Sequence, residues 1–327
     1  MKNIATILIL LFIAVIAHSQ AVHNPVLNSD FPDPTVIKAT DGKFYAYATQ
    51  TKLNGKWINI QVATSADGYS WQIIGDALPA KPGWASHTQD FWAPHVMYDE
   101  GMKKYVMFYS AESDDTATTK CLGVALSDAP QGPFIDKGSP LITGKGFVNI
   151  DPMLLIDPVS HKKLLYWGSG FKPIKVQEMN DDLQSFKAGT TAADLVYPNK
   201  DTAYSHLVEG AWVDYNDGKY YLYYSGDNCC VNTINYAVMV ARADSPFGPF
   251  TRLSETTGTS NSAIVEKDEV WTAPGHNSLF RDDKGTLWMA YHAVKLDDYN
   301  AHKPFKRVMC INPVEYKNGW PVLVKKY

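Results

Sequence analysis

DGKYYLYYS, residues 217–225, joins a turn signal to a run of aromatic side chains, and this combination recurs at four other places in the chain. Asp-Gly favours a tight hairpin turn, while tyrosine and phenylalanine favour strands, where their rings pack on a pleated surface. Each copy therefore predicts a turn followed by a strand. The other copies are DGKFYAYAT (41–49), EGMKKYVMFYS (100–110), HKKLLYWGS (161–169) and DKGTLWMAYH (283–292).

The copies are evenly spaced, because their turns begin at residues 41, 101, 161, 217 and 284. A period of about 60 residues with several short strands per unit is typical of propeller blades and too long for helical solenoid repeats. Three segments downstream of a copy add a further alternating strand and a small polar turn. They are VATSADGYSW (62–71), GVALSDAPQGPF (123–134) and VMVARADSPFGPF (238–250).

Turn signals and helix signals support the same fold class. Asp-Gly and Asn-Gly pairs punctuate the chain at residues 41, 54, 67, 217 and 318, and their density favours antiparallel hairpins. Convincing helical periodicity is absent beyond the N-terminus, where the nearest candidate, residues 176–186, is short and polar. We therefore predict an all-β chain folded as a five-bladed β-propeller, in preference to a β-sandwich with coincidentally similar hairpins.

The N-terminus has the pattern of a secretory signal peptide. Met1-Lys2 precedes an apolar run over residues 4–16, and a small-x-small signal at residues 17–19 precedes Gln20. The apolar run is too short to span a membrane, and no similar run follows it. We expect residues 1–19 to be a signal peptide, residues 20–327 to form a single propeller domain, and the protein to be secreted or periplasmic.

Charge and cysteine content exclude some classes of function. The formal net charge of −4, with no basic run, argues against nucleic acid and anionic membranes as partners. Cys121, Cys229, Cys230 and Cys310 match no zinc-binding spacing, and no cysteine lies where a lipid anchor would be attached. The adjacent pair leaves two interpretations open: a vicinal disulfide, or two free or differently paired thiols.

A polar or aromatic residue precedes each repeated turn by about eight positions. In a propeller the innermost strand of each blade lies beside the axis, so these residues should converge near one end of it. Aspartate before proline is usually a turn element, but the matched placement in successive units favours a shared site. The five residues are Asp33, Trp92, Asp151, Glu209 and His276.

The three carboxylates among them adjoin apolar strands, where a charge is costly to bury without a partner. Carboxylates that meet at one site cannot all ionise freely, because burial and neighbouring negative charge raise some pKa values. One can then remain an ionised base while another is held protonated. Glycoside hydrolysis with inversion needs this division, with the two working carboxyls roughly 6.5–9.5 Å apart and a third group tuning the acid.

Other side chains suit a sugar pocket. Phe31, Trp92 and Trp212 are candidates for stacking on apolar sugar faces, and the alternative for each is a place in the core. His276 is a candidate for binding a metal directly or through water, against a hydrogen-bonded structural histidine. Arg307 either pairs with an axial carboxylate or lies on the surface.

Six motifs run in a fixed order along the chain: NPVLNSDFPDPTVI (24–37), WAPHV (92–96), NIDPM (149–153), EGAWV (209–213), GHNSLF (275–280) and NGWPVL (318–323). Together they closely resemble glycoside hydrolase family 43, whose five-bladed β-propeller enzymes act on arabinan, arabinoxylan and xylo-oligosaccharides. The resemblance implies an inverting hydrolase in which Asp33 is the general base, Asp151 the pKa modulator and Glu209 the general acid.

The resemblance also implies that Trp92 lines the substrate pocket, that His276 is the axial histidine often near a bound calcium, and that Arg307 lies near the carboxylates. It implies no catalytic cofactor, and any calcium at the axis would be structural or tuning. The expected partner is an oligo- or polysaccharide, and we expect a monomer.

Substrate identity is a separate expectation. Family members with xylosidase activity often carry an extra C-terminal β-sandwich, and this chain ends with its propeller, which favours an α-L-arabinofuranosidase or endo-arabinanase over a β-xylosidase or other xylan-active enzyme. Loops 112–120 and 197–204 should decide between a pocket and an open groove. Two further alternatives are a non-catalytic carbohydrate-binding propeller and a retaining, sucrose-cleaving or transfructosylating propeller.

Overall fold

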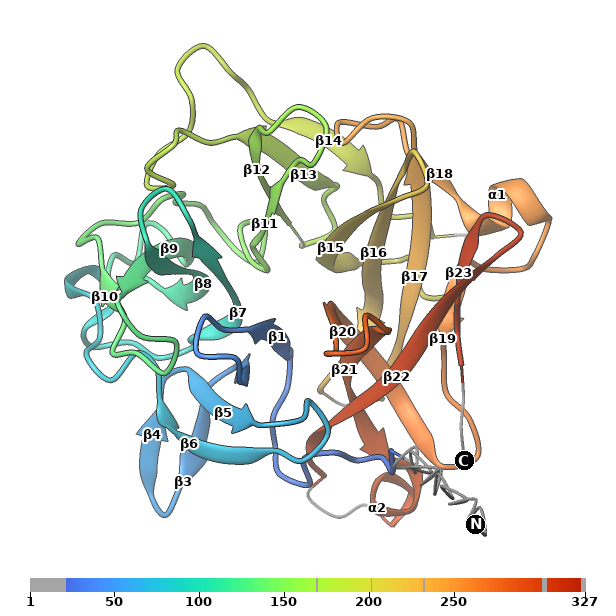
Figure 1. Cartoon of the computed structure of the whole chain (residues 1–327), viewed down its shortest axis with the longest axis horizontal. Helices are drawn as coiled ribbons and strands as arrows, with labels where there is room; N and C mark the ends of the chain where they lie inside the picture. The colour runs from blue at the N-terminus through green and yellow to red at the C-terminus, as the bar shows by residue number, and fades with distance from the viewer. Residues whose placement is uncertain (1–21, 169, 201, 232, 302–304, 325–327) are drawn as a thin grey trace, which may run out of the picture.

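Five antiparallel sheets surround a common axis in the computed structural model, which describes residues 22–168, 170–200, 202–231, 233–301 and 305–324 (Figure 1). The sheets follow one another around the ring in chain order, so the predicted five-bladed β-propeller is confirmed. The predicted signal peptide, residues 1–19, lies outside the described residues. None of the helices in the described part is long and apolar enough to cross a membrane.

The first two blades each run from an inner strand near the axis to an outer strand at the rim. Blade 1 contains β1 (Thr35–Lys38), β2 (Phe44–Ala48), β5 (Gln61–Ser65) and β6 (Gln72–Asp76), with the hairpin β3 (Thr51–Leu53) and β4 (Lys56–Ile58) inserted after its second strand. Blade 2 contains β7 (Trp92–Asp99), β8 (Lys104–Glu112), β9 (Lys120–Ser127) and β10 (Ile135–Asp136), preceded by the 3-10 helix η1 (Gly83–Ala85).

The remaining three blades repeat this order. Blade 3 contains β11 (Met153–Ile156), β12 (Lys163–Trp167), β13 (Ile174–Glu178) and β14 (Ala193–Val196). Blade 4 contains β15 (Val208–Asn216), β16 (Lys219–Asn228), β17 (Asn235–Ala243) and β18 (Thr251–Arg252), and β19 (Ala263–Val265), which follows α1 (Leu253–Thr257), also pairs with β17. Blade 5 contains β20 (Trp271–Arg281), β21 (Leu287–Lys295), β22 (Arg307–Lys317) and β23 (Trp320–Leu323), with α2 (Leu296–Asn300) after its second strand.

The repeated aromatic segments form the second strand of each blade and supply the core. Successive side chains of a strand point to opposite faces, so each second strand packs against both neighbouring blades. In β2, Tyr45 and Tyr47 join the cluster shared with blade 2, whereas Phe44 and Ala46 join the cluster shared with blade 5. Comparable clusters lie between the other neighbouring blades. Because both faces are buried, these strands lack the alternation of a strand that faces water on one side.

The predicted Asp-Gly and Asn-Gly turns all lie at hairpin tips. Asn54, Asp217 and Asn318 and the glycine after each have positive φ, as a two-residue hairpin turn requires. Tight turns keep consecutive strands of a blade adjacent, and this local connectivity builds the sheet in chain order.

Each inner strand bends within its first half, or just before it begins, at a residue in the left-handed conformation. One such residue per blade is Asp33 (φ 57°), Ala93 (φ 47°), Asp151 (φ 59°), Gly210 (φ 61°) and His276 (φ 47°), and β20 has a second, Ala273 (φ 47°). In β7, β15 and β20 the strand pairing shifts register at this point, as it does at a β-bulge. The equivalent positions therefore differ from the sequence prediction, because Trp92 and Glu209 precede the bend by one residue.

The last residue of four copied motifs holds the bend of the next blade. The backbone N–H of the bent residue donates to Thr49 Oγ1 (2.9 Å, from Ala93), Ser110 Oγ (3.0 Å, from Asp151), Ser225 Oγ (2.8 Å, from His276) and His292 Nδ1 (3.2 Å, from Asp33). At blade 4, Gly210 N–H donates instead to Asp151 Oδ2 at 3.0 Å. The aromatic repeat thus also fixes the backbone of the residues that surround the axis.

The N-terminal segment closes the ring between blades 5 and 1. Leu27 forms an antiparallel bridge with Met309 of β22, and Phe31 N–H donates to the Arg307 carbonyl at 2.9 Å. The Asn24 amide donates to the Ile311 carbonyl at 3.0 Å. The hydrogen bond between Phe31 and the Arg307 carbonyl places Arg307 beside the segment that carries Asp33.

Candidate active site

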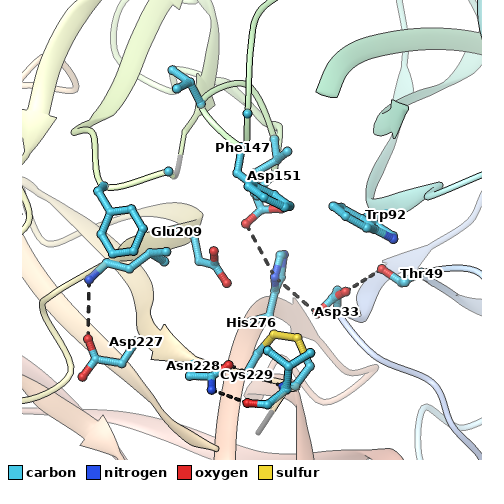
Figure 2. A pocket seen from close by; sticks show the side chains of 18 of the residues that line it. Asp33, Thr49, Trp92, Phe147, Asp151, Glu209, Asp227, Asn228, Cys229 and His276 are labelled. Atoms are coloured by element: carbon cyan, nitrogen blue, oxygen red, sulfur yellow. Dashed lines mark hydrogen bonds and ion pairs between the residues drawn. A yellow bond between two sulfur atoms is a disulfide. The ribbon is translucent and has the colours of Figure 1, made fainter. Parts of the chain in front are cut away.

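A cavity of about 690 Å³ opens at the end of the axis where the inner strands begin (Figure 2). Six residues predicted from the sequence line it: Asp33, Trp92, Asp151, Glu209, His276 and Arg307. They come from all five inner strands or their approaches and from the start of β22. The structure therefore brings together the three predicted carboxylates and the predicted histidine and arginine.

Two predicted sugar-stacking aromatics lie elsewhere, and the prediction for them is wrong. Phe31 is fully buried in the cluster between blades 5 and 1, where no ligand can reach its ring. Trp212 lies three residues past Glu209 on β15 and lines a depression farther along the inner strands, with His95 and Leu154. An inner strand passes along the axis, so a few residues move a side chain from one end of it towards the other.

The pocket walls also differ from the loops predicted to shape them. Neither loop 112–120 nor loop 197–204 contributes a described residue to the lining. The walls instead come from residues 145–148, Gly170 and Phe171 of the blade 3 region, and from residues 227–231 after β16.

Asp33 is ionised despite its burial. Burial alone would raise the pKa of its carboxyl, but His276, Arg307 and His292 together hold that pKa well below its usual range. The Arg307 guanidinium lies 3.6 Å from Asp33 Oδ1 and His276 Nδ1 lies 3.4 Å from it. Because burial lowers the pKa of His276, the permanently charged Arg307 is the cation that keeps Asp33 ionised at neutral pH. Thr49 Oγ1 donates to the other oxygen, Oδ2.

Asp151 is the opposite case. Burial raises its pKa well above the usual range, and the neighbouring carboxyl groups of Glu209 and Asp33 raise it further. A neutral Asp151 results, and its Oδ2 accepts the backbone N–H of Gly210, the residue after Glu209. Asp151 therefore fixes the backbone that carries Glu209 while remaining uncharged itself.

Glu209 is positioned by a tyrosine that sequence reasoning missed. The Tyr236 hydroxyl donates to Glu209 Oε1 at 2.7 Å, and burial raises the pKa of Tyr236 well above its usual range, which keeps it a donor. A Cβ at Gly275 would lie 2.1 Å from the Tyr236 ring, so the glycine of the GHNSLF motif makes room for this contact. Tyr236 is the second residue of β17, the third strand of its blade, and lies outside every motif that pointed to the axis.

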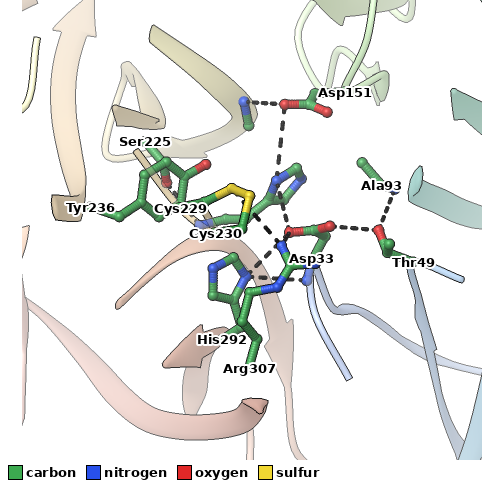
Figure 3. A network of polar contacts seen from close by, with 12 residues as sticks. Asp33, Thr49, Ala93, Asp151, Ser225, Cys229, Cys230, Tyr236, His292 and Arg307 are labelled. Atoms are coloured by element: carbon green, nitrogen blue, oxygen red, sulfur yellow. Dashed lines mark hydrogen bonds and ion pairs between the residues drawn. A yellow bond between two sulfur atoms is a disulfide. The ribbon is translucent and has the colours of Figure 1, made fainter. Parts of the chain in front are cut away.

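His292 and Thr49 were also missed as site residues, although both end a copied motif. Burial lowers the pKa of His292 to about 4, so its ring is neutral and Nδ1 accepts the Asp33 N–H. The His292 ring is stacked on Tyr236 with centroids 5.6 Å apart. One neutral histidine therefore connects the supports of Asp33 and Glu209 (Figure 3).

His276 lies between the carboxylates, with Nδ1 3.4 Å from Asp33 Oδ1 and 3.9 Å from Asp151 Oδ2. In the part of the chain that the structure describes, no group of three or more His, Cys, Asp or Glu side chains is arranged to hold a metal ion. Calcium needs six to eight oxygen ligands, which the described side chains around His276 do not supply directly.

Trp92 faces the pocket as part of an aromatic stack. Its ring is parallel to that of Phe147, with centroids 6.1 Å apart and an interplanar angle of 2°. Lys120 Nζ lies 4.2 Å from the Trp92 ring centroid and pairs with Asp90 at 2.7 Å. Phe147 and Phe171 are 52% and 69% exposed, so apolar ring faces remain open at the rim. Such faces suit the C–H surfaces of a sugar ring.

The two adjacent cysteines form a disulfide, Cys229–Cys230, and both line the pocket. Cys121 and Cys310 are buried free thiols. The structure therefore selects the vicinal disulfide from the two interpretations that the sequence left open.

The chain is similar to enzymes that act on arabinan. The model of the family described as "Glycosyl hydrolases family 43" matches residues 22–321. The probable arabinan endo-1,5-alpha-L-arabinosidase A of Aspergillus flavus is 27% identical, over 97% of this chain and 98% of its own length. The extracellular endo-alpha-(1->5)-L-arabinanase 1 of Bacillus subtilis is 26% identical, over 93% of this chain and 91% of its own length.

Solved structures share the fold over nearly the whole chain. A thermostable family-43 glycoside hydrolase superposes with a TM-score of 0.75 at 26% identity, covering 94% of this chain and 96% of its own. An endo-1,4-beta-xylanase from Bacteroides thetaiotaomicron superposes with a TM-score of 0.73 at 26% identity, covering 91% of this chain and 95% of its own.

Proposed function

The chain belongs to glycosyl hydrolases family 43 and is a glycoside hydrolase acting on O-glycosyl bonds, and from this premise we propose that it cleaves α-L-arabinofuranosyl linkages of arabinan-type saccharides with inversion. The observation that carries the proposal is the unequal protonation of the carboxylates in one pocket. Asp33 is held ionised and Asp151 neutral, while Glu209 lies on the other side of His276 from Asp33 (Figure 2).

In the proposed step, Asp33 is the general base and Glu209 the general acid. Asp33 accepts a proton from a water molecule as the water oxygen forms a bond to the anomeric carbon. The glycosidic C–O bond breaks on the opposite face, and Glu209 gives its proton to the leaving oxygen. Because attack and departure occur on opposite faces, the product anomer is inverted.

The remaining polar groups hold these two in place. Arg307 and Thr49 fix the carboxylate of Asp33, and Tyr236 fixes that of Glu209. Neutral Asp151 orients the Glu209 backbone through Gly210. The retaining alternative would need a carboxylate close enough to the anomeric carbon to bond to it; the first-formed anomer, observed by NMR, distinguishes the two mechanisms.

The arabinan substrate is supported by the two curated relatives, each of which is an endo-acting arabinanase by name. The structural likeness to an endo-1,4-beta-xylanase at the same identity supports a xylan-type substrate as the second candidate. Both polymers present five-carbon sugars of similar size to one pocket, so the preference depends on ring shape and linkage geometry.

Export and cofactor use complete the proposal. The signal-peptide pattern of residues 1–19 and the extracellular Bacillus subtilis relative support secretion. The acid–base steps above need no cofactor, and any calcium at the axis would have a structural role. Dialysis against EDTA tests that role: a lower unfolding midpoint with unchanged kcat supports it, and a lost kcat that calcium restores contradicts it.

A product profile tests the proposed substrate. The purified protein is incubated with debranched arabinan, arabinoxylan and xylo-oligosaccharides, and in parallel with aryl α-L-arabinofuranoside and aryl β-D-xyloside. We expect release of arabinose or arabino-oligosaccharides at the highest kcat/KM. Preferential release of xylose products would favour a xylan-type substrate. Binding of oligosaccharide without turnover of any substrate would favour a non-catalytic carbohydrate-binding propeller.

A further inference from the structure

The Cys229–Cys230 disulfide forms part of the pocket wall, and the acid–base steps make no use of it. Both cysteines lie in the loop that joins β16 to β17 and line the cavity together with Asn228 and Val231. Cys230 is exposed and Cys229 is half-buried. The bond between adjacent residues closes a small ring, so this part of the wall has fewer conformations than an ordinary loop.

The back of the disulfide is supported by an apolar cluster. Cys229 packs against buried Ile234, Tyr236, Ala273 and Val294. Tyr236 in this cluster is the residue whose hydroxyl donates to Glu209. Cys229 therefore packs on the cluster that contains Tyr236, the residue that positions the proposed acid.

The front of the disulfide adjoins the support of the proposed base. Arg307 Nη1 lies 4.0 Å from Cys229 Sγ and 3.6 Å from Asp33 Oδ1. Figure 3 shows the disulfide between Tyr236 and Arg307, facing the network that holds Asp33. The disulfide thus lines the same cavity as Asp33 and Glu209.

We propose that the vicinal disulfide is a rigid contact platform for the sugar ring bound beside Arg307, and thereby a determinant of glycan affinity and specificity. Disulfide sulfur is polarisable and only weakly hydrated, so it suits the C–H face of a sugar better than a charged or amide side chain does. A wall that is already rigid loses little conformational entropy when a ligand binds. This inference rests on the proposed glycosidase function, since it names a contact in the same pocket.

The first test compares wild type with the double variant Cys229→Ala, Cys230→Ala on arabino-oligosaccharides of increasing length. We expect KM to rise about tenfold, equivalent to about 1.4 kcal/mol of lost contact, with kcat changed by less than about threefold. If the disulfide had only a structural role, the double variant would instead have a lower unfolding midpoint and a smaller active fraction, with the KM of the active molecules unchanged. Cys310→Ala, which removes a buried thiol away from the pocket lining, is the matched control and should keep the wild-type KM.

The second test uses reversible reduction of the wild-type protein and needs no variant to fold. A dithiol reductant gives two electrons and two protons to the Cys229–Cys230 bond, yielding two thiols, and is itself oxidised to a disulfide. We expect the same rise in KM, reversed on reoxidation, and no response from the double variant. An unchanged KM in both tests would overturn the proposal that the disulfide contacts the sugar. A wild-type protein that hydrolyses no glycoside overturns the proposed function instead, so the two failures are distinguishable.

Discussion

The two ends of the propeller axis are built from the same five inner strands, yet only one carries opposed carboxylates. At the end where these strands begin, Asp33, Asp151 and Glu209 surround His276. Farther along the same strands a second depression is lined mainly by apolar side chains, and its charged or titratable residues are His95, Asp214 and Arg281. Each end has a histidine and a tryptophan, so residue type alone does not separate them.

The surroundings of the two histidines differ. His95 lies against Trp212, with ring centroids 5.3 Å apart, and burial lowers its pKa to about 3. His276 lies 3.4 Å from the ionised Asp33. The five inner strands lie around the axis at both ends. Only at the end with the carboxylates do bends in these strands turn polar side chains towards one point. Function therefore depends on the side chains at each bend or one residue before it.

The largest expected effect comes from the same substitution made at each end. Asp33→Asn removes the proposed base, so kcat should fall by about 10³-fold on every substrate, whatever its leaving group. Asp214→Asn, at the second depression, changes a half-buried carboxyl that accepts the Tyr316 hydroxyl, and kcat should stay within about threefold of wild type. Steady-state kinetics on one aryl glycoside measures both. If kcat fell to a similar extent in both variants, catalysis could not be assigned to the pocket that holds Asp33.

The two tryptophans give a smaller and different contrast. Trp92→Ala removes a ring that faces the pocket, so KM should rise about tenfold while kcat changes less. Trp212→Ala removes a ring that packs on two interblade clusters, so it should lower the unfolding midpoint and leave KM unchanged. Kinetics and thermal unfolding of both variants check this. If only Trp212→Ala raised KM, the sugar would bind at the second depression and not in the pocket that holds the carboxylates.

The smallest expected effect is on the pH dependence of stability. A carboxyl whose pKa is higher in the folded than in the unfolded protein stabilises the folded state fully at pH values below its unfolded-state pKa, about 3.9. This stabilisation is lost as the pH rises through the folded-state pKa. Burial and its two carboxylate neighbours raise the pKa of Asp151 in this way. The wild-type unfolding midpoint should therefore fall more between about pH 5 and pH 9 than that of Asp151→Asn, which cannot ionise. Thermal unfolding across this range measures the difference, and parallel curves would mean that Asp151 is not held neutral.

Most of the architecture was predictable because local signals determine it. Aromatic second strands and two-residue turns recur in the sequence, and each specifies a hairpin without long-range information. Closure of the ring was not predicted, since the contact of Leu27 with Met309 joins segments from opposite ends of the chain.

The site was most readily predictable where a charged side chain stands out against an apolar strand. Asp33, Asp151 and Glu209 do so, and all three line the pocket. Phe31 and Trp212 were misplaced because an aromatic residue beside the axis looks the same in sequence whether it faces the core, the pocket or the other end. Tyr236 went unnoticed because its contact with Glu209 requires an approach between strands that depends on Gly275.

The most direct test of the acid and base assignments is the leaving-group dependence of kcat/KM for Glu209→Gln and Asp33→Asn, each relative to wild type. On a series of aryl glycosides, the loss for Glu209→Gln should grow with the pKa of the leaving phenol, because only poor leaving groups need protonation. The loss for Asp33→Asn should be large and constant across the series. Equal losses that follow the same trend for both variants would contradict the account.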